Sequence, residues 1–178
     1  MPFELLQSDK VYRGKAFHVR QDRVRAPDGQ VMQLDIVEHV GAVTVIPWDE
    51  QGRIWFVRQY RHAAGRELLE LPAGTLEAGE DPEDCAWREI REETGLGAGR
   101  LVKLGEFFLA PGYSSEYMHV YLATDLYPDP LPGDVDEFLS LAVYPLEQVA
   151  MLVNSGELQD AKSLAALLLA RNQLGVLA

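Results

Sequence analysis

Residues 74–96 read GTLEAGEDPEDCAWREIREETGL, and this stretch predicts a loop followed by one helix. Asp81 belongs to the residue types that cap helix N-termini, and Pro82 suits the first helical position. Gly95 is the residue type at which helices commonly end. We therefore expect a helix that runs from Pro82 to about Thr94.

Three glutamates share one side of this helix, because residues three and four apart lie on the same face. Glu89 and Glu93 are four residues apart, and Glu92 lies beside them. Like charges this close cost roughly a few tenths of a kcal/mol for each pair. A divalent cation would reverse that cost, since Mg²⁺ and Mn²⁺ prefer carboxylate oxygens. Taken alone, the three residues fit either a metal site or a solvated acidic face.

The opposite stripe of the helix carries small and apolar side chains. Ala86, Ile90 and Thr94 form this stripe, and we expect them to pack on a sheet. Cys85, the single cysteine of the chain, has no histidine near it in sequence, so we interpret it as a small helix residue and not as a nucleophile. The four histidines are scattered and lack the spacing of zinc ligands.

The rest of the chain predicts strands on both sides of this helix and further helices at its end. Turn-forming residues separate short β-prone stretches, and the Pro- and Asp-rich segment 127–135 is expected to be a loop. This order is typical of an α+β or α/β layered fold. We expect strands at 11–14, 16–25, 31–39, 43–47, 54–60, 67–71, 101–109, 116–123 and 138–144, and helices at 145–151 and 159–173.

The composition indicates a single folded domain and disfavours two kinds of partner. The chain has 178 residues, of which 47% are hydrophobic, enough for a real core. Its net charge of -12 disfavours nucleic acid and anionic membranes as partners, whereas a phosphorylated small molecule is acceptable if a cation screens the site. With one cysteine, no signal peptide and no apolar run long enough to span a bilayer, a cytoplasmic location is expected.

The stretch from Gly74 to Leu96 resembles the Nudix box, which is a glycine, a spaced glutamate and then Arg-Glu-aliphatic-x-Glu-Glu-x-Gly-aliphatic. The resemblance implies the Nudix fold, a mixed β-sheet sandwiched between helices, with the box as a loop–helix–loop. It also implies hydrolysis of a nucleoside diphosphate linked to another group, with Mg²⁺ or Mn²⁺ as the cofactor. Glu80 fills the spaced position and is expected to hold the loop against the helix.

The same resemblance assigns roles to residues of the box. It implies that Glu89 and Glu93 bind the metal, with Glu92 beside them and the backbone carbonyl of Ala73 as a further ligand. Arg88 is expected to orient the glutamates through charge-assisted hydrogen bonds.

Segments outside the box resemble the ADP-ribose pyrophosphatases. Pro111 stands at the distance after the box that is typical of this subfamily, although Ala110 replaces its frequent serine, and Glu116 matches a glutamate near the substrate. In the segment before the box, the resemblance implies that Arg61 grips a phosphate oxygen and that Glu70 contacts a ribose hydroxyl or supports the metal. An ordinary turn and a surface arginine are the alternatives for Pro111 and Arg61.

The resemblance implies cleavage of ADP-ribose to AMP and ribose 5-phosphate. The alternatives are a Nudix hydrolase of another nucleotide sugar or dinucleotide, and a Nudix-fold regulator that binds a nucleotide without cutting it. A calcium-binding protein ranks last because the chain lacks the Asp-rich loop with a central glycine.

The attacking water needs a base, and the sequence offers several. Glu92 and Glu93 on the helix are candidates, as are Asp136 and Glu137 in the late acidic loop, which also contains Asp134. The sequence does not select one of them.

The N-terminal strands have their own expected role. Residues 1–40 are expected to form an antiparallel sheet that mediates homodimerisation and contributes to the substrate pocket, as in ADP-ribose pyrophosphatases, while residues 41–178 form the catalytic domain. A covering sheet of a monomer is the alternative.

Overall fold

The structure is a computed structural model that describes residues 2–133 and 137–175. The chain divides into two compact units. The first unit consists of Met1–Gly41 with Phe107–Tyr117, and the second of Ala42–Glu106 with Met118–Ala178.

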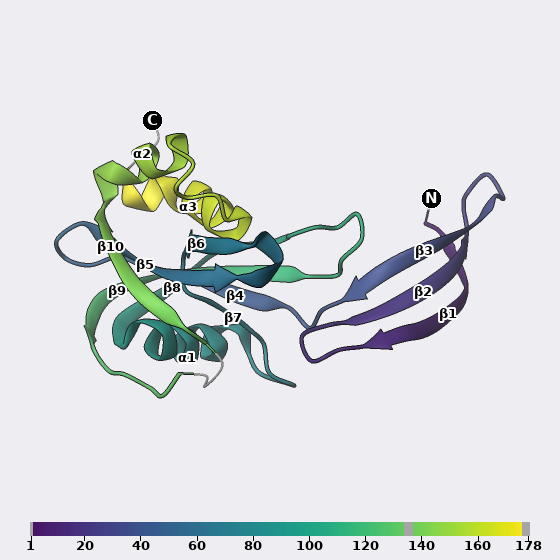
Figure 1. Cartoon of the computed structure of the whole chain (residues 1–178), viewed down its shortest axis with the longest axis horizontal. Coiled ribbons are helices and arrows are strands. Elements are labelled where there is room, and N and C mark those ends of the chain that lie inside the picture. The colour runs from purple at the N-terminus through teal and green to yellow at the C-terminus, as the bar shows by residue number, and fades with distance from the viewer. Residues whose placement is uncertain (1, 134–136, 176–178) are drawn as a thin grey trace. The chain divides into compact units, whose positions relative to one another are not determined.

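The first unit is built on a three-stranded antiparallel sheet (Figure 1). Its order is β1 (Glu4–Arg13), β2 (His18–Arg25) and β3 (Val31–Glu38). The backbone N–H of Val37 donates to Tyr113 at 2.8 Å, which ties the Phe107–Tyr117 segment to β3. The expected strand 11–14 was too short, because pairing with β2 extends β1 back to Glu4.

The second unit contains two sheets (Figure 1). One has the order β10-β5-β6 and the other β7-β4-β9-β8, with β4 buried along its whole length and parallel to β9. Their bounds are β4 (Ala42–Pro47), β5 (Arg53–Arg61), β6 (Arg66–Glu70), β7 (Ala73–Thr75), β8 (Leu96–Phe108), β9 (Tyr117–Pro128) and β10 (Leu139–Pro145).

The helix α1 (Pro82–Thr94) has the predicted bounds. The Asp81 side chain accepts a hydrogen bond from the backbone N–H of Glu83 at 2.8 Å, and Gly95 ends the helix with a φ of 72°. The predicted packing stripe is confirmed, since Ala86 and Ile90 are fully buried. Cys85 and this stripe pack against the core side chains Val43, Val45, Ala98, Tyr121 and Ala123.

The chain ends in α2 (Val149–Asn154) and α3 (Ala161–Leu174), joined to the sheets through β10. Figure 1 shows α1 and α3 on opposite sides of the strands of this unit, and both contact β4. The predicted helix 145–151 was wrong at its start, because Pro145 still belongs to β10 and a 3-10 turn precedes Val149. No helix among residues 2–133 and 137–175 has the length and apolarity needed to cross a membrane.

Candidate active site

Glu89 on α1 lies against the backbone of Gly74, in the segment that joins β6 to α1. Gly74 lies not in a loop, as expected, but in the short strand β7, which pairs with β4. A Cβ atom added at Gly74 would lie 1.8 Å from Oε1 of Glu89, so only a glycine leaves room for this carboxylate. Glu89 itself is only 7% exposed.

Glu93 is held by the same short segment. Its Oε2 accepts a hydrogen bond from the backbone N–H of Ala73 at 3.0 Å. Strand β4 holds this segment in place. The carbonyl of Pro72 accepts hydrogen bonds from the N–H of Val45 at 2.9 Å and from Oγ1 of Thr44 at 3.1 Å. The core strand β4 thus fixes the backbone that positions Glu93.

Arg88 links the glutamates of the helix to the preceding loop. Its Nη1 donates to Oε1 of Glu89 at 2.5 Å and to Oε2 of Glu92 at 2.9 Å. Its Nε and Nη2 donate to the two oxygens of Glu80 at 2.9 and 3.0 Å. Glu80 also accepts the N–H of Glu77 at 2.8 Å, so it holds the loop and the helix together as expected.

Burial and crowding shift the pKa values of these carboxyls. Burial raises the pKa of Glu89 to about 7 against the opposing effect of Arg88. Burial also raises the pKa of Glu93 to about 8, although the N–H of Ala73 lowers it, and the Glu89 charge adds to the rise. Glu80 behaves in the opposite way, because its hydrogen bonds with Arg88 lower its pKa to about 2.

We expect the metal-free protein to lose stability as the pH rises. Glu89 and Glu93 have folded pKa values of about 7 and about 8, above the usual 4.5, so the folded state binds more protons than the unfolded state up to those values. Their stabilising contribution is complete below about pH 4.5 and is lost through about pH 8. In EDTA, the Tm should therefore fall between about pH 6 and about pH 9.

Excess Mg²⁺ should reduce this fall, because a cation binds the ionised carboxylates. Thermal unfolding at both pH values, with EDTA and with Mg²⁺, measures the effect. Equal Tm values in EDTA at the two pH values would contradict the assigned shifts.

The carboxylates fit a divalent cation by their chemistry. Glu89, Glu92 and Glu93 bring hard oxygen donors to one helix face, with the backbone of Ala73 next to them. Within the described ranges, no three His, Cys, Asp or Glu side chains already stand in a metal-binding arrangement. Arg88 is the counter-charge of Glu89 and Glu92 in this structure, so cation binding would require these side chains to turn.

Arg61 and Glu70 form a bidentate ion pair next to this site. Nε of Arg61 donates to Oε1 of Glu70 at 2.8 Å, and Nη2 donates to Oε2 at 2.7 Å. The hydrogen bonds to Glu70 raise the pKa of Arg61 most, and the charge of Glu93 adds to that rise, so Arg61 lies within electrostatic range of Glu93. Lys162 completes the group as a second cation on Glu70, although nothing in the sequence around it marks this lysine as a site residue.

The candidates in the late loop divide into described and undescribed residues. Glu137 is described, and its charge raises the pKa of both Glu89 and Glu93, so it belongs to the same electrostatic cluster. Asp134 and Asp136 lie outside the described residues.

Pro111 and Glu116 lie in the first unit, in the loop between β8 and β9. The backbone carbonyl of Glu116 accepts the N–H of Leu109 at 3.1 Å, and the N–H of Glu116 donates to Oγ of Ser114 at 3.1 Å. The structure therefore brings the box, Arg61, Glu70 and Glu137 together in one unit, and assigns Pro111 and Glu116 to the other.

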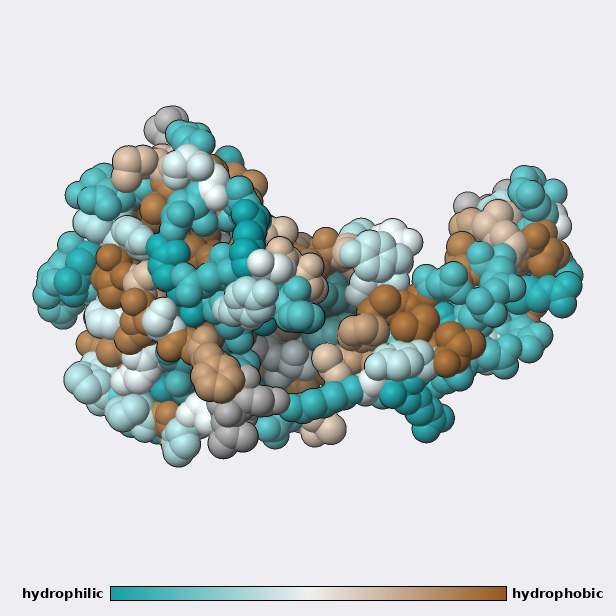
Figure 2. Space-filling view, in the orientation of Figure 1, coloured by the Kyte–Doolittle hydropathy of each residue, from teal (hydrophilic) through white to brown (hydrophobic). Residues whose placement is uncertain are grey.

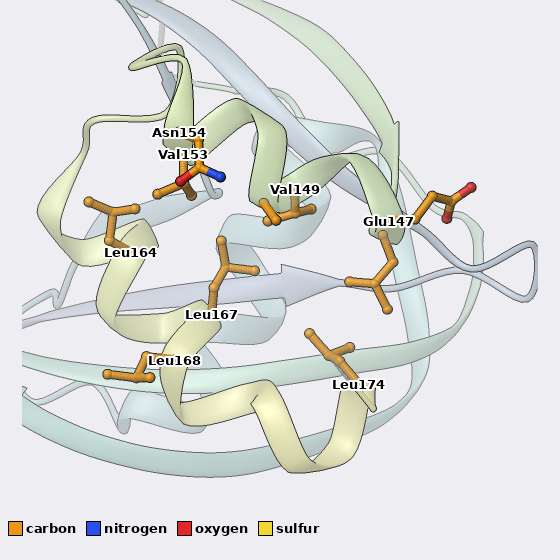
Figure 3. Close-up of a pocket in the computed structure, with 10 residues that line it drawn as sticks. Glu147, Val149, Val153, Asn154, Leu164, Leu167, Leu168 and Leu174 are labelled. Carbon is orange, nitrogen blue, oxygen red and sulfur yellow. The ribbon is translucent and has the colours of Figure 1, made fainter. Parts of the chain in front are cut away.

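A separate cavity of about 560 Å³ lies between α2 and α3 (Figure 3). None of the candidate site residues lines it. Aliphatic side chains dominate its wall, and they give no group that could bind a phosphate. The cavity is lined by Leu146, Glu147, Val149, Ala150, Val153, Asn154, Leu164, Leu167, Leu168 and Leu174.

Comparisons with known proteins converge on one family and one fold. The family model described as NUDIX domain matches residues 38–167. A Mycobacterium tuberculosis protein named ADP-ribose pyrophosphatase is 40% identical over 171 residues, which cover 93% of this chain and 82% of that protein. A Bacillus subtilis protein of the same name is 37% identical over 164 residues, or 91% and 89% of the two chains. A crystal structure described as ADP compounds hydrolase matches with a TM-score of 0.88 and 28% identity, over 98% of this chain and 95% of that one.

Proposed function

The chain belongs to the NUDIX family, and we propose that this hydrolase cleaves ADP-ribose to AMP and ribose 5-phosphate with Mg²⁺ as its cofactor. The expected fold, a mixed sheet sandwiched between helices with an N-terminal antiparallel sheet, is confirmed. The observation that carries the proposal is the cluster of Glu89, Glu92 and Glu93 around Arg88 and Ala73. The named relatives support ADP-ribose as the substrate.

Glu89, Glu93 and Glu92 would hold the cation, together with the backbone carbonyl of Ala73. Mg²⁺ supplies positive charge that screens the diphosphate and makes a nearby water more acidic. Mn²⁺ prefers the same oxygen donors and could replace it. Before a cation binds, the hydrogen bonds from Arg88 hold the Glu89 and Glu92 carboxylates side by side on one face of α1.

The remaining roles belong to residues around this cluster. Arg61 would bind a phosphate oxygen, and its bond to Glu70 fixes the plane of the guanidinium. The candidates for the base are Glu92, Glu93, Glu137 and Asp136. The influence of the Glu137 charge on the metal-binding candidates supports its place in that group.

A substrate panel tests the proposed activity. The purified protein is incubated with ADP-ribose, ADP-glucose, GDP-mannose, NADH and diadenosine polyphosphates, each with Mg²⁺, with Mn²⁺ and with EDTA. We expect the highest kcat/KM for ADP-ribose with Mg²⁺, with AMP and ribose 5-phosphate as products and no turnover in EDTA. A higher kcat/KM for another compound would make that compound the assigned substrate in place of ADP-ribose. Nucleotide binding without turnover of any compound would favour the non-catalytic regulator.

The N-terminal strands support a homodimer in which residues 1–40 form the interface and contribute to the substrate pocket. Every residue of β1 is exposed. A three-stranded sheet gains stability when its apolar face is covered, and exposed apolar patches commonly mark protein–protein interfaces. Figure 2 shows apolar surface over these strands. The exposed apolar residues are Phe3, Leu5, Leu6, Val11, Tyr12, Phe17, Val31 and Leu34.

Sedimentation velocity should give twice the mass of one chain. Leu5→Glu should shift the protein to the mass of a single chain, because the substitution places a charge in the proposed apolar interface. Gln7→Glu is the matched control, since it adds the same charge to the exposed strand β1 without removing an apolar group. A single-chain mass for the unmodified protein would rule out the homodimer.

A further inference from the structure

We propose that Lys162, at the start of α3, is a positioning residue of the active site that acts through buried Glu70 on Arg61. The inference rests on the proposed contact between Arg61 and the diphosphate. It adds to the proposed site a residue of α3, about a hundred residues after Arg61 in the chain and outside both the box and the late acidic loop.

The evidence begins with a carboxylate that is buried between two cations. Glu70 is only 2% exposed, and Lys162 is only 8% exposed. Nζ of Lys162 donates to Oε2 of Glu70, the same oxygen that accepts Nη2 of Arg61 at 2.7 Å. Oε1 of Glu70 accepts Nε of Arg61 at 2.8 Å. Both oxygens of Glu70 are therefore engaged by cationic donors.

A buried carboxylate stays ionised only if nearby charges offset its loss of hydration. Burial raises the pKa of Glu70, but the hydrogen bonds and charges of Arg61 and Lys162 outweigh it and keep the pKa below its usual value. Lys162 is the more buried of the two cations, whereas the Arg61 side chain is 42% exposed. Lys162 is thus the buried counter-charge of Glu70, while Arg61, which also pairs with Glu70, stays partly open to solvent.

The bond to Glu70 determines which edge of Arg61 remains for a ligand. The two contacts use Nε and Nη2, one edge of the planar guanidinium, so Nη1 lies away from Glu70. Glu70 is the main cause of the raised pKa of Arg61, and the Glu93 charge adds to it, so the guanidinium lies within electrostatic range of this metal-binding candidate. A guanidinium fixed in this plane needs less ordering when it binds a phosphate oxygen.

The start of α3 is itself clamped to the end of β6. Asp160 caps α3 and accepts Nζ of Lys162 at 2.9 Å and the N–H of Ser163 at 3.0 Å. Oγ of Ser163 accepts the backbone N–H of Leu71 at 2.7 Å. Lys162 therefore reaches Glu70 from a helix end that is already fixed next to it, which suits a positioning role.

A double-mutant cycle tests the inference on the full-length protein with Mg²⁺ and ADP-ribose. We expect Lys162→Met to raise KM about tenfold or more with a smaller change in kcat, because buried Glu70 loses one of its two counter-charges and then orients Arg61 less firmly. Arg61→Met should raise KM at least as much. In the Arg61→Met background, Lys162→Met should change KM by less than about twofold, since the residue through which it acts is gone.

Additive effects of the two substitutions on KM would overturn the inference, as would a normal KM for a folded Lys162→Met variant. Lys103→Met is the matched control, because Lys103 is a partly exposed lysine that pairs with Glu106 on β8, and it should keep the wild-type KM. If Lys162→Met does not fold, Lys162→Gln replaces it in the same cycle, since glutamine keeps an N–H donor and loses the charge. A wild-type KM for Arg61→Met would also overturn the inference, while ADP-ribose turnover by the unmodified protein would still stand.

Discussion

Replacement of Glu93 by glutamine is expected to lower kcat by about a thousandfold or more while the protein stays folded. Glu93 is the proposed metal ligand that is bonded to the backbone, because its carboxylate accepts a hydrogen bond from the N–H of Ala73. A glutamine keeps the size and one oxygen for that hydrogen bond but removes the charge that a cation needs. The measurement is the rate of AMP release at saturating ADP-ribose over a range of Mg²⁺ concentrations.

Glu83→Gln is the matched control for this substitution. It makes the same chemical change on the same helix, at an exposed position in the first turn. This variant should keep the wild-type rate. A Glu93→Gln variant that reached the full rate at high Mg²⁺ would contradict the metal assignment, and unchanged circular dichroism would exclude unfolding as the cause of a loss.

Gly74→Ala is expected to reduce kcat/KM by about a hundredfold or more. The new Cβ would lie 1.8 Å from Oε1 of Glu89 and 1.9 Å from its Cδ, far inside van der Waals contact. Glu89 lies against the sheet in a buried place, so either its carboxylate must leave or β7 must shift from β4. Both changes disturb the proposed cation site, since Ala73 and Glu93 are joined through the same strand.

Gly105→Ala is the control for a glycine-to-alanine change. A Cβ at Gly105 would meet only the end of the Leu169 side chain, at 3.2 Å, and that side chain can move. Its kcat/KM should stay within about twofold of the wild type. A Gly74→Ala variant with normal activity would show that Glu89 does not need its place beside β7.

The helix that carries the glutamates could be predicted from the sequence because its determinants are local. Asp81 caps the start of the helix and Gly95 caps its end, and both adopt the expected conformations. The glutamate face follows from helical periodicity alone, so the grouping of Glu89, Glu92 and Glu93 needed no tertiary information.

The strands that were missed depend on partners distant in the chain. The segment Glu4–Lys10 has no strong alternation, and its strand forms because β2 supplies hydrogen bonds to it. Gly74 indicated a loop because glycine weakens strands, whereas in the structure its missing side chain makes room for Glu89. Both outcomes are tertiary effects that outweigh local preference.

Lys162 shows the same limit for the site itself. Lysine is among the residues least often fully buried, so a single lysine near a helix start predicts a solvated side chain. Its burial depends on Glu70, which lies 92 residues earlier in the chain. Only the folded structure brings these two residues together.

The location of a bound cation tests the central claim most directly. Crystals grown with Mn²⁺ are measured at a wavelength where manganese scatters anomalously, with Glu93→Gln crystals as the comparison. The account predicts an anomalous peak bounded by carboxylate oxygens of Glu89 and Glu93 and close to the Ala73 carbonyl, and a weaker peak or none in the variant. A peak elsewhere, or Glu89 and Glu92 still bonded to Arg88 with no ion beside them, would contradict it.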